Sequence, residues 1–229
     1  MIEEPKALTI RRPKRRPSAD QIAAFQGVPT SFVVDAMFGG GALDTNISQL
    51  PGQTAHVAGP ALTVDNRPSD ILALLGALAL VQPGDVVMNG AAGFQGCAAA
   101  GDRVCGMLKN NGAAGFVTDG PMRDLEGLLD VGLPAWCTGL TPDSPFSTGP
   151  GKIGLPVQIG GRHVETGDMI VADENGVVVV PFDRIAEVVS RLEAVKTSEA
   201  ELDGEVAAGR KIPDPIAEML DGPNVDWIE

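Results

Sequence analysis

The 229-residue sequence predicts one α/β domain with a layered or mixed sheet, followed by a helical tail. Strand-like and helix-like segments alternate through the middle of the chain, between residues 54 and 136. Beyond this region the pattern changes to strands only, and residues 183–203 then have the apolar stripe of a long amphipathic helix. Eight strand–helix units are not present, so a TIM barrel is excluded.

Capping and turn residues define the individual elements. Ser18 and Thr30 are suitable N-caps for helices over 19–26 and 31–37. Gly59 is expected to break an extended region into two strands. The other predicted elements are strands over 54–57, 60–64, 86–88 and 114–117, helices over 71–80, 103–110 and 125–130, and hairpin strands over 157–159, 169–172 and 177–180. The corresponding organisation is a basic N-terminal arm over 1–18, an α/β domain over 19–182, and a C-terminal helix and tail over 183–229.

Charge is unevenly distributed along the chain. The net charge is −13, but residues 1–16 carry six basic and two acidic side chains, so the remainder carries −17. An acidic body repels phosphate backbones, which argues against a nucleic-acid partner. We favour the interpretation that the basic arm is solvated or packed on a neighbour, with an RNA-binding tail as the alternative.

The sequence pattern also argues against secretion and membrane insertion. The longest apolar run, 71–81, is too short to cross a bilayer, and the first residues lack the apolar core of a signal peptide. Cys97, Cys105 and Cys137 form no Cys-x-x-Cys pair, so neither a disulfide framework nor a cysteine metal site is expected. We therefore expect a cytoplasmic location and no membrane partner.

Residues 101–124 combine two features that place ligands in α/β proteins. Gly101 and Asp102 precede a predicted helix, whose first backbone N–H groups lack partners within the helix and attract anions. The run 119–124, Asp-Gly-Pro-Met-Arg-Asp, follows a buried strand, and open α/β sheets bind ligands at the carboxyl ends of their strands. A strand–helix–strand arrangement brings both features to the same edge of the sheet.

The side chains of this segment have the chemistry needed to hold a 2-oxo acid. The helix N–H groups and Arg123 can bind a carboxylate, and Asp102 and Asp124 offer hard oxygen ligands for a Mg²⁺-type cation. A cation beside a guanidinium stabilises an enolate oxygen, which points to carbon–carbon cleavage next to a 2-oxo acid. The structural alternative is that Arg123 and Asp124 form only a helix cap and a surface charge.

Several ordered motifs carry a resemblance to a known family. They are Ala-Gly-Pro-Ala-Leu-Thr-Val at 58–64, Pro-Gly-Asp-Val-Val at 83–87, Asp102 with Arg123-Asp124, and Asp-Glu-Asn-Gly-Val-Val-Val-Val-Pro at 173–181. Across residues 29–181 the chain resembles class II pyruvate aldolases of the 4-hydroxy-4-methyl-2-oxoglutarate and 4-carboxy-4-hydroxy-2-oxoadipate type. These enzymes share a fold with the regulator of ribonuclease activity A. The resemblance implies a β/β/α swivelling-type fold, assembled as a homotrimer or a homohexamer.

The resemblance also implies an activity and roles for individual residues. Asp124 would bind Mg²⁺ or Mn²⁺ directly, and Asp102 would hold water beside the metal and assist proton transfer. Arg123 would bind the pyruvyl oxygen and stabilise the enolate. The implied reaction is cleavage of a 4-hydroxy-2-oxo acid to pyruvate and a second oxo compound, with oxaloacetate decarboxylation as a companion activity.

Further residues are assigned by the same resemblance. The backbone at Gly101, Arg103 and Val104 would hold the substrate carboxylate. Family aldolases bring a glutamate from a neighbouring subunit's C-terminal helix toward the metal, and Glu199 occupies the matching place before Ala208-Gly209. A solvent-facing glutamate on an acidic helix is the alternative. Family members have an apolar residue where Arg103 stands, and the sequence after Gly209 also departs from theirs, which leaves the distal substrate group open.

Three other functions compete with this interpretation of the sequence. A non-catalytic regulator of ribonuclease activity on the same fold would act through its surface and need no metal. A Schiff-base aldolase needs a lysine with a lowered pKa in a desolvated pocket, and Lys109, Lys152 and Lys196 fall on predicted helices or in a loop. A Rossmann dehydrogenase is disfavoured because no Gly-x-Gly-x-x-Gly motif follows a strand.

Overall fold

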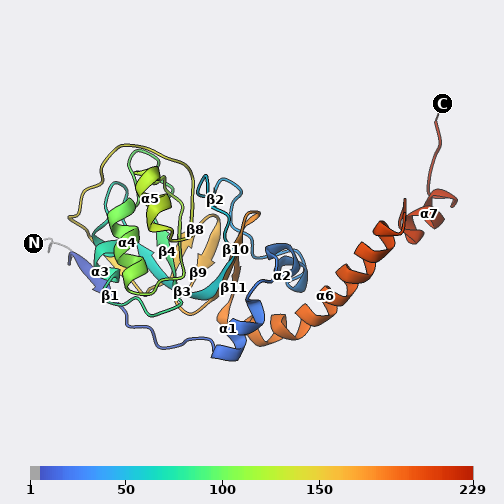
Figure 1. The fold of residues 1–229 in the computed structure, drawn as a ribbon, viewed down its shortest axis with the longest axis horizontal. Helices are drawn as coiled ribbons and strands as arrows, with labels where there is room; N and C mark the ends of the chain where they lie inside the picture. The colour runs from blue at the N-terminus through green and yellow to red at the C-terminus, as the bar shows by residue number, and fades with distance from the viewer. Residues whose placement is uncertain (1–5, 229) are drawn as a thin grey trace, which may run out of the picture.

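The computed structural model describes residues 6–228, so the first five residues of the predicted arm and the last residue of the tail lie outside the described residues. Figure 1 shows a body of sheet and helices from which α6 and α7 project. The helices are α1 (Ala19–Phe25), α2 (Thr30–Ala36), α3 (Leu72–Ala77), α4 (Asp102–Asn110), α5 (Leu125–Val131), α6 (Ile185–Ala207) and α7 (Asp214–Leu220), with a 3₁₀ turn at Phe182–Arg184. The strands are β1 (Leu8–Ile10), β2 (Ser48–Gln49), β3 (Val57–Asp65), β4 (Val86–Gly90), β5 (Gly115–Thr118), β6 (Ala135–Cys137), β7 (Gly151–Ile153), β8 (Val157–Ile159), β9 (Arg162–Val164), β10 (Met169–Asp173) and β11 (Gly176–Val180).

The sheet is mixed, and β3 joins its two parts. The second half of β3 begins a parallel series β3-β4-β5-β6. The first half pairs antiparallel with β10, which forms the predicted hairpin with β11. On the other edge β7 pairs antiparallel with the end of β3, and β1 pairs parallel with β7. This arrangement confirms the predicted layered α/β domain.

The expected strand break at Gly59 is wrong, because β3 runs unbroken through this residue. A Cβ atom at Gly59 would lie 2.2 Å from the carbonyl oxygen of Gly84. Glycine is therefore required here because the turn before β4 approaches the strand closely, and not because the strand ends. Residues 54–56, which were expected to be extended, lie outside the strand.

Alternating side chains of the strands fill three apolar cores. Leu62, Val87 and Phe116 face α3, α4 and α5 in the first core, while Val86 and Val117 point into the second, between the two parts of the sheet. The outer face of β10 and β11 packs against α1, α2 and the start of α6 in the third core. Successive residues of these strands therefore point to opposite faces of the sheet, and both faces are buried and apolar.

Capping differs between the first two helices. Ser18 forms the expected cap of α1, as a reciprocal capping box with Gln21. The predicted N-cap at Thr30 is wrong, because Pro29 is the N-cap of α2 and Thr30 is its first residue. Instead, the backbone N–H and the hydroxyl of Thr30 donate to the carboxylate of Asp173, at 2.9 and 2.8 Å. The hairpin of β10 and β11 thus supplies the cap through a side chain distant in the sequence.

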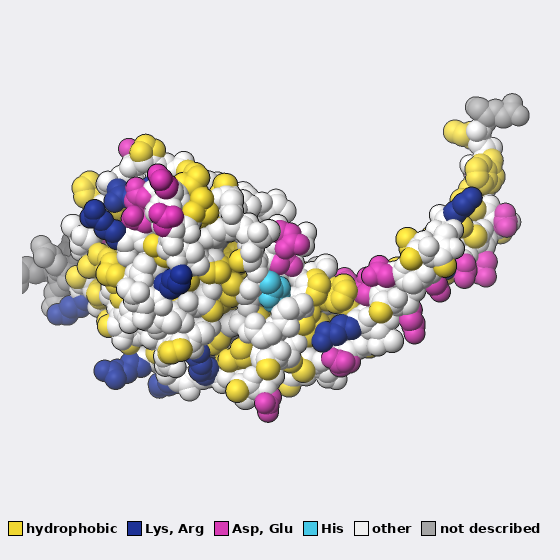
Figure 2. All heavy atoms as spheres, in the orientation of Figure 1, with side chains coloured by type: hydrophobic (Ala, Val, Ile, Leu, Met, Phe, Trp, Pro, Cys, Tyr) yellow, Lys and Arg dark blue, Asp and Glu magenta, His cyan; other side chains and the backbone are white. Residues whose placement is uncertain are grey.

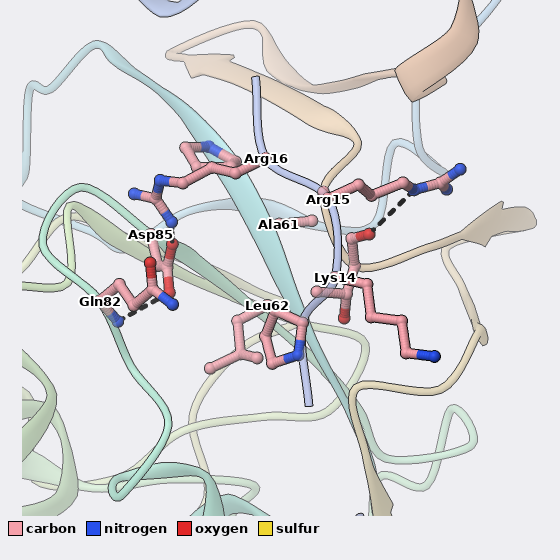
Figure 3. A pocket seen from close by; sticks show the side chains of 11 residues that line it. Lys14, Arg15, Arg16, Ala61, Leu62, Gln82 and Asp85 are labelled. Carbon is pink, nitrogen blue, oxygen red and sulfur yellow. Dashed lines mark hydrogen bonds and ion pairs between the residues drawn. The ribbon is translucent and has the colours of Figure 1, made fainter. Parts of the chain in front are cut away.

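The arm, defined here as residues 6–18, packs on the body of its own chain. Arg16 forms an ion pair with the buried Asp85, and Arg15 pairs with Glu165 at 2.6 Å and Asp168 at 3.5 Å. Figure 3 shows these arginines on either side of a cavity of about 160 Å³ beneath the arm. Arg15 and Arg16 are engaged by carboxylates at this cavity, whereas Lys14, which also lines it, forms no ion pair within residues 6–228.

The tail extends away from the body. The first turns of α6 are buried through Ile185, Val188 and Leu192. Further along, Val206 of α6 and Met219 of α7 are exposed, and Figure 2 shows apolar and acidic side chains along this projection. Among residues 6–228, no helix has the length and apolar character that a membrane crossing requires.

Candidate functional site

The carboxyl end of β5 lies beside the segment that leads into α4, as the strand–helix–strand argument predicted. The backbone N–H of Ala99 donates to the carbonyl of Pro121 at 2.7 Å, and the N–H of Arg123 donates to the carbonyl of Ala100 at 3.1 Å. These two hydrogen bonds bring Gly101, at the N-cap of α4, next to Arg123 and the residue that follows it. The predicted site residues at the sheet edge are therefore brought together.

Asp124 occupies an unusual backbone conformation at the start of α5. Its φ of 66° and ψ of 51° are left-handed, which aspartate tolerates better than most residues with a side chain. Although Asp124 stands at the N-cap position, its side chain makes no capping hydrogen bond. The carboxylate is instead about half exposed and lies 3.4 Å from the Nε of Arg123. The helix-cap part of the structural alternative is therefore wrong for the Asp124 side chain, although both charged groups remain partly exposed.

Gly101 permits this close arrangement. A Cβ atom at Gly101 would lie 2.8 Å from Oδ2 of Asp124 and 3.2 Å from Cγ of Arg123. The backbone of Gly101 is extended, with φ −137° and ψ −175°, so its conformation does not require glycine. Space is the constraint, because a side chain here would displace the carboxylate or the arginine.

Asp102 is the first residue of α4 and packs against α5. A Cβ atom at Gly127 would lie 2.6 Å from Oδ2 of Asp102, so this small residue leaves room for the carboxylate. Oδ1 of Asp102 accepts a hydrogen bond from the backbone N–H of Arg103 at 2.6 Å. The predicted carboxylate-binding N–H of Arg103 is therefore engaged by the protein, and a ligand would have to compete with Asp102 for it.

These groups line one cavity of about 430 Å³. It contains all the predicted rim residues, namely Gly101, Asp102, Arg103, Val104, Arg123 and Asp124. Another part of its wall is formed by Ile71, Ala98 and Pro145, which the sequence pattern did not identify. Next to this wall, Nη1 of Arg123 donates to the hydroxyl of Ser144 at 2.5 Å. No motif marks these wall residues, because they come from loops that meet only in the folded chain.

The donor set suits a hard cation that keeps much of its water. Within residues 6–228, no cluster of three or more His, Cys, Asp or Glu side chains is arranged to hold a metal ion. Mg²⁺ commonly binds through only one or two carboxylates, with water and substrate oxygens as its other ligands. Asp124, with Asp102 on the same cavity, fits that pattern, whereas a zinc-type site with four protein ligands does not fit.

Other acidic and nucleophilic groups near the edge have structural roles. Burial raises the pKa of Asp119, and hydrogen bonds from the N–H groups of Ala91 and Gly93 partly oppose this shift. These bonds, at 2.6 and 2.9 Å, hold the loop after β4, so Asp119 stabilises that loop. Burial also raises the pKa of Cys105 to about 12, which keeps its thiol protonated, as suits a buried packing residue.

Glu199 lies on α6, beyond the part of this helix that packs on the body. Figure 1 shows α6 leading away from the body, whereas α4 and α5 lie at the opposite end of the molecule. Within one chain, Glu199 is therefore not brought to the cavity of Asp102 and Asp124. Its predicted role requires a second subunit and stays a prediction.

Known proteins are similar to this chain over most of its length, and not only at the sheet edge. A protein from Halalkalibacterium halodurans, named "Putative 4-hydroxy-4-methyl-2-oxoglutarate aldolase", is 40% identical over 162 residues, covering 71% of this chain and 77% of that protein. Streptomyces coelicolor RraAS2, described as an unusual member of the RNase ES inhibitor RraA protein family, is 31% identical with a TM-score of 0.71, covering 84% of this chain and 100% of that one. An uncharacterized protein from Pseudomonas syringae pv. tomato is 26% identical with a TM-score of 0.76, covering 88% of this chain and 94% of that one.

The fold and the site together define an α/β protein with a carboxylate- and arginine-lined cavity at the edge of its sheet. The family model described as RraA-like, Aldolase/RraA, matches residues 30–179. This chain therefore belongs to the RraA-like family.

Proposed function

We propose that this protein is a divalent-metal-dependent lyase that cleaves a 4-hydroxy-2-oxo acid to pyruvate and a second oxo compound. The observation that carries the proposal is the shared cavity of Asp102, Arg123 and Asp124 beside the start of α4. The aldolase name of the Halalkalibacterium halodurans relative supports the same chemistry. Decarboxylation of oxaloacetate is the expected companion activity, because it passes through the same pyruvate enolate.

Each residue of the cavity has a distinct task in this proposal. Asp124 would hold Mg²⁺ or Mn²⁺, and the ion would supply a hard positive charge for the oxygens of the 2-oxo acid. Arg123 would bind the keto oxygen and stabilise the negative charge that develops there when the C3–C4 bond breaks. Asp102 would receive the 4-hydroxyl proton through a water at its carboxylate. The N–H of Val104 and, in competition with Asp102, that of Arg103 would hold the substrate carboxylate.

The proposed enzyme acts as a homotrimer or homohexamer. The exposed apolar and acidic tail is suited to packing on a neighbouring subunit, because isolated exposure of so many apolar side chains is unfavourable. Glu199 of that tail would then approach the cavity of the neighbour and assist the proton transfer begun at Asp102. Arg103, whose side chain is exposed at the cavity, is a candidate for contact with the distal part of the substrate.

The direct test is metal-dependent release of pyruvate. The chain is stripped with EDTA and assayed with 4-hydroxy-4-methyl-2-oxoglutarate, 4-carboxy-4-hydroxy-2-oxoadipate and oxaloacetate, with pyruvate detected through lactate dehydrogenase. We expect turnover only after Mg²⁺ or Mn²⁺ is restored, and no inactivation by borohydride in the presence of pyruvate. Absence of turnover on all three acids with either metal would overturn the proposal.

A regulator of ribonuclease activity is the second candidate, favoured by the similarity to the Streptomyces coelicolor member of the RNase ES inhibitor family. Such a protein would bind a ribonuclease through its surface without needing the carboxylates of the cavity. Metal-independent inhibition of an RNase E-type enzyme that survives Asp124→Asn, together with absent pyruvate release, would favour the regulator over the lyase.

A further inference from the structure

The guanidinium of Arg123 is held at two points by the protein. Its Nε lies 3.4 Å from Oδ2 of Asp124, and its Nη1 donates to the hydroxyl of Ser144 at 2.5 Å. A guanidinium is a planar fork with five N–H donors, so contacts at both of these nitrogens restrict its rotation. The remaining donors stay available at the cavity that Arg123 lines.

Ser144 belongs to an outer loop, residues 141–149, that is itself fastened to the body. At its start, the N–H of Thr141 donates to the carbonyl of Met122 at 2.9 Å. The carbonyl of Asp143 then accepts the N–H of Ala98 at 3.0 Å. These bonds attach the residues on the N-terminal side of Ser144 to the same two segments that carry the cavity.

The other end of the outer loop is anchored by Asp70, which is only 8% exposed. Its Oδ2 accepts hydrogen bonds from the N–H groups of Thr148 and Gly149, at 2.7 and 2.9 Å. Between the two ends of the outer loop, Phe146 forms backbone hydrogen bonds with Ser69 and Ile71. Burial opposes the ionised form of Asp70, but hydrogen bonds from the N–H groups of Leu72, Thr148 and Gly149 lower its pKa below the ordinary value, so the anchor is charged at neutral pH.

We propose that Ser144 is a positioning residue, which fixes the guanidinium of Arg123 toward the ligand, with the outer loop as its rigid support. The inference rests on the proposed lyase function for its kinetic consequence, but the contact itself concerns only this chain. A freely rotating arginine must lose that freedom each time the reaction occurs, whereas an arginine that is already oriented does not. Ser144 acts through Arg123 and needs no contact with the substrate.

Ser147 provides a matched control in the same loop. It is an exposed serine three residues further on, and its side chain makes no hydrogen bond with another residue between 6 and 228. Ser144→Ala and Ser147→Ala therefore remove the same atom from the same loop, and only the first removes the contact with Arg123. Ser144→Thr keeps a hydroxyl and tests whether that group restores the effect.

The experiment has a spectroscopic arm that does not depend on activity. In protein with ¹⁵N-labelled arginine side chains, the Arg123 Nε–H signal is assigned by its disappearance in Arg123→Lys. We expect its exchange with solvent to be at least about threefold faster in Ser144→Ala than in wild type or Ser147→Ala, since the guanidinium has lost one of its two anchors. Equal exchange in all three proteins would overturn the proposal.

The kinetic arm follows the lyase assay. We expect kcat to fall about fivefold in Ser144→Ala with KM changed less than about twofold, because Arg123 acts most strongly on charge that develops during the reaction. Ser144→Thr should recover most of this loss, and Ser147→Ala should match wild type. If wild type releases no pyruvate, the lyase proposal fails while the spectroscopic arm still decides the role of Ser144. If the wild-type protein is an active lyase, an unchanged kcat in Ser144→Ala would overturn the proposed positioning role of Ser144.

Discussion

Gly101 and Asp124 approach each other so closely that a side chain at residue 101 would displace the Asp124 carboxylate. The Cβ position of Gly101 is 2.8 Å from Oδ2 of Asp124, which is closer than real Cβ atoms come to a non-bonded heavy atom. Gly101 and Asp124, which are 23 positions apart in the sequence, thus pack against each other at the N-terminus of α4. The absence of a side chain at Gly101 leaves the helix start open to the cavity and keeps the carboxylate beside it.

Replacement of Gly101 should therefore impair the site while leaving the fold intact. We expect Gly101→Ala to weaken Mn²⁺ binding and pyruvate release by at least about tenfold, because the methyl group would displace Asp124. Gly106, in the same helix, is the control, since its Cβ would approach only Val131, at 3.7 Å. Gly106→Ala should keep full activity and gain about 0.5–1 kcal/mol of unfolding free energy. Equal activity in the two variants would contradict the assigned fit.

The charge of Asp124 should be essential for metal binding. Asparagine tolerates the left-handed backbone of this residue, so Asp124→Asn removes the charge with little backbone strain. We expect calorimetry to show loss of Mn²⁺ binding and assays to show activity lowered about 10³-fold. Asp130→Asn, at an exposed aspartate of the same helix, should leave both unchanged. Retained metal affinity in Asp124→Asn would place the ion elsewhere.

The sequence pattern was sufficient for the sheet edge but not for its surroundings. The carboxyl ends of parallel strands lie at one edge of a sheet. The positions of Asp102 and Asp124 at predicted element boundaries were therefore enough to predict that these residues lie close together. Ser144 and Asp70 could not be identified, because their contacts depend on a loop whose path no local pattern determines. The strand break predicted at Gly59 was wrong for a similar reason. Glycine is favoured both where a strand ends and where another backbone segment, here that of Gly84, approaches closely, and the sequence does not distinguish the two.

The arm offers a pH-dependent test of a buried ion pair. Burial raises the pKa of Asp85 above its ordinary 3.8, and the hydrogen bond from Gln82 and the contact with Arg16 oppose this rise. Because the folded chain then binds this proton more tightly than the unfolded chain, the contribution of Asp85 to stability is greatest below pH 3.8 and declines as pH rises through the raised pKa. Without Arg16 the pKa rises further and the decline is larger.

We accordingly expect Arg16→Ala to lose about 1–2 kcal/mol of unfolding free energy at pH 7, a modest value since the guanidinium is one-third exposed. The loss should shrink as the pH is lowered toward the ordinary carboxyl pKa of 3.8, because a growing fraction of Asp85 is then protonated and no longer needs a cation. Urea unfolding across this range measures the difference, with Arg12→Ala, at an exposed arginine of the arm, as the control. A loss of equal size at every pH would exclude Asp85 as its origin.

Cys105 should be chemically inert in the folded protein despite its position on α4. Its pKa of about 12, raised first by burial and further by Asp102 and Cys137, leaves almost no thiolate at pH 8. We expect mass spectrometry to find no carbamidomethylation of Cys105 after iodoacetamide treatment of the native chain, and complete modification in urea. Cys105→Ala should keep activity within about twofold. Rapid labelling of the native chain would show that α4 opens far more readily than its packing indicates.

The final prediction concerns the role of Glu199 across subunits. If the tail of one subunit completes the cavity of another, Glu199→Gln and Asp124→Asn impair different halves of the same composite site. Each homo-oligomer should then have little activity, whereas co-expressed chains would form hybrids that contain some cavities with both Asp124 and a neighbour's Glu199. A hybrid purified through two different affinity tags should therefore recover a measurable fraction of wild-type activity.

The control for this complementation is Glu201→Gln, at an exposed residue two positions further along the same acidic helix. This variant should be active by itself, and its hybrids with Asp124→Asn should be no more active than the Glu201→Gln subunits they contain. Full activity of the Glu199→Gln homo-oligomer would show that this side chain only faces solvent. Inactive hybrids of two individually folded variants would show that Glu199 does not act at the cavity of a neighbouring subunit. Action at the cavity of its own subunit is incompatible with the conformation of α6 in Figure 1, where this helix leads away from the body.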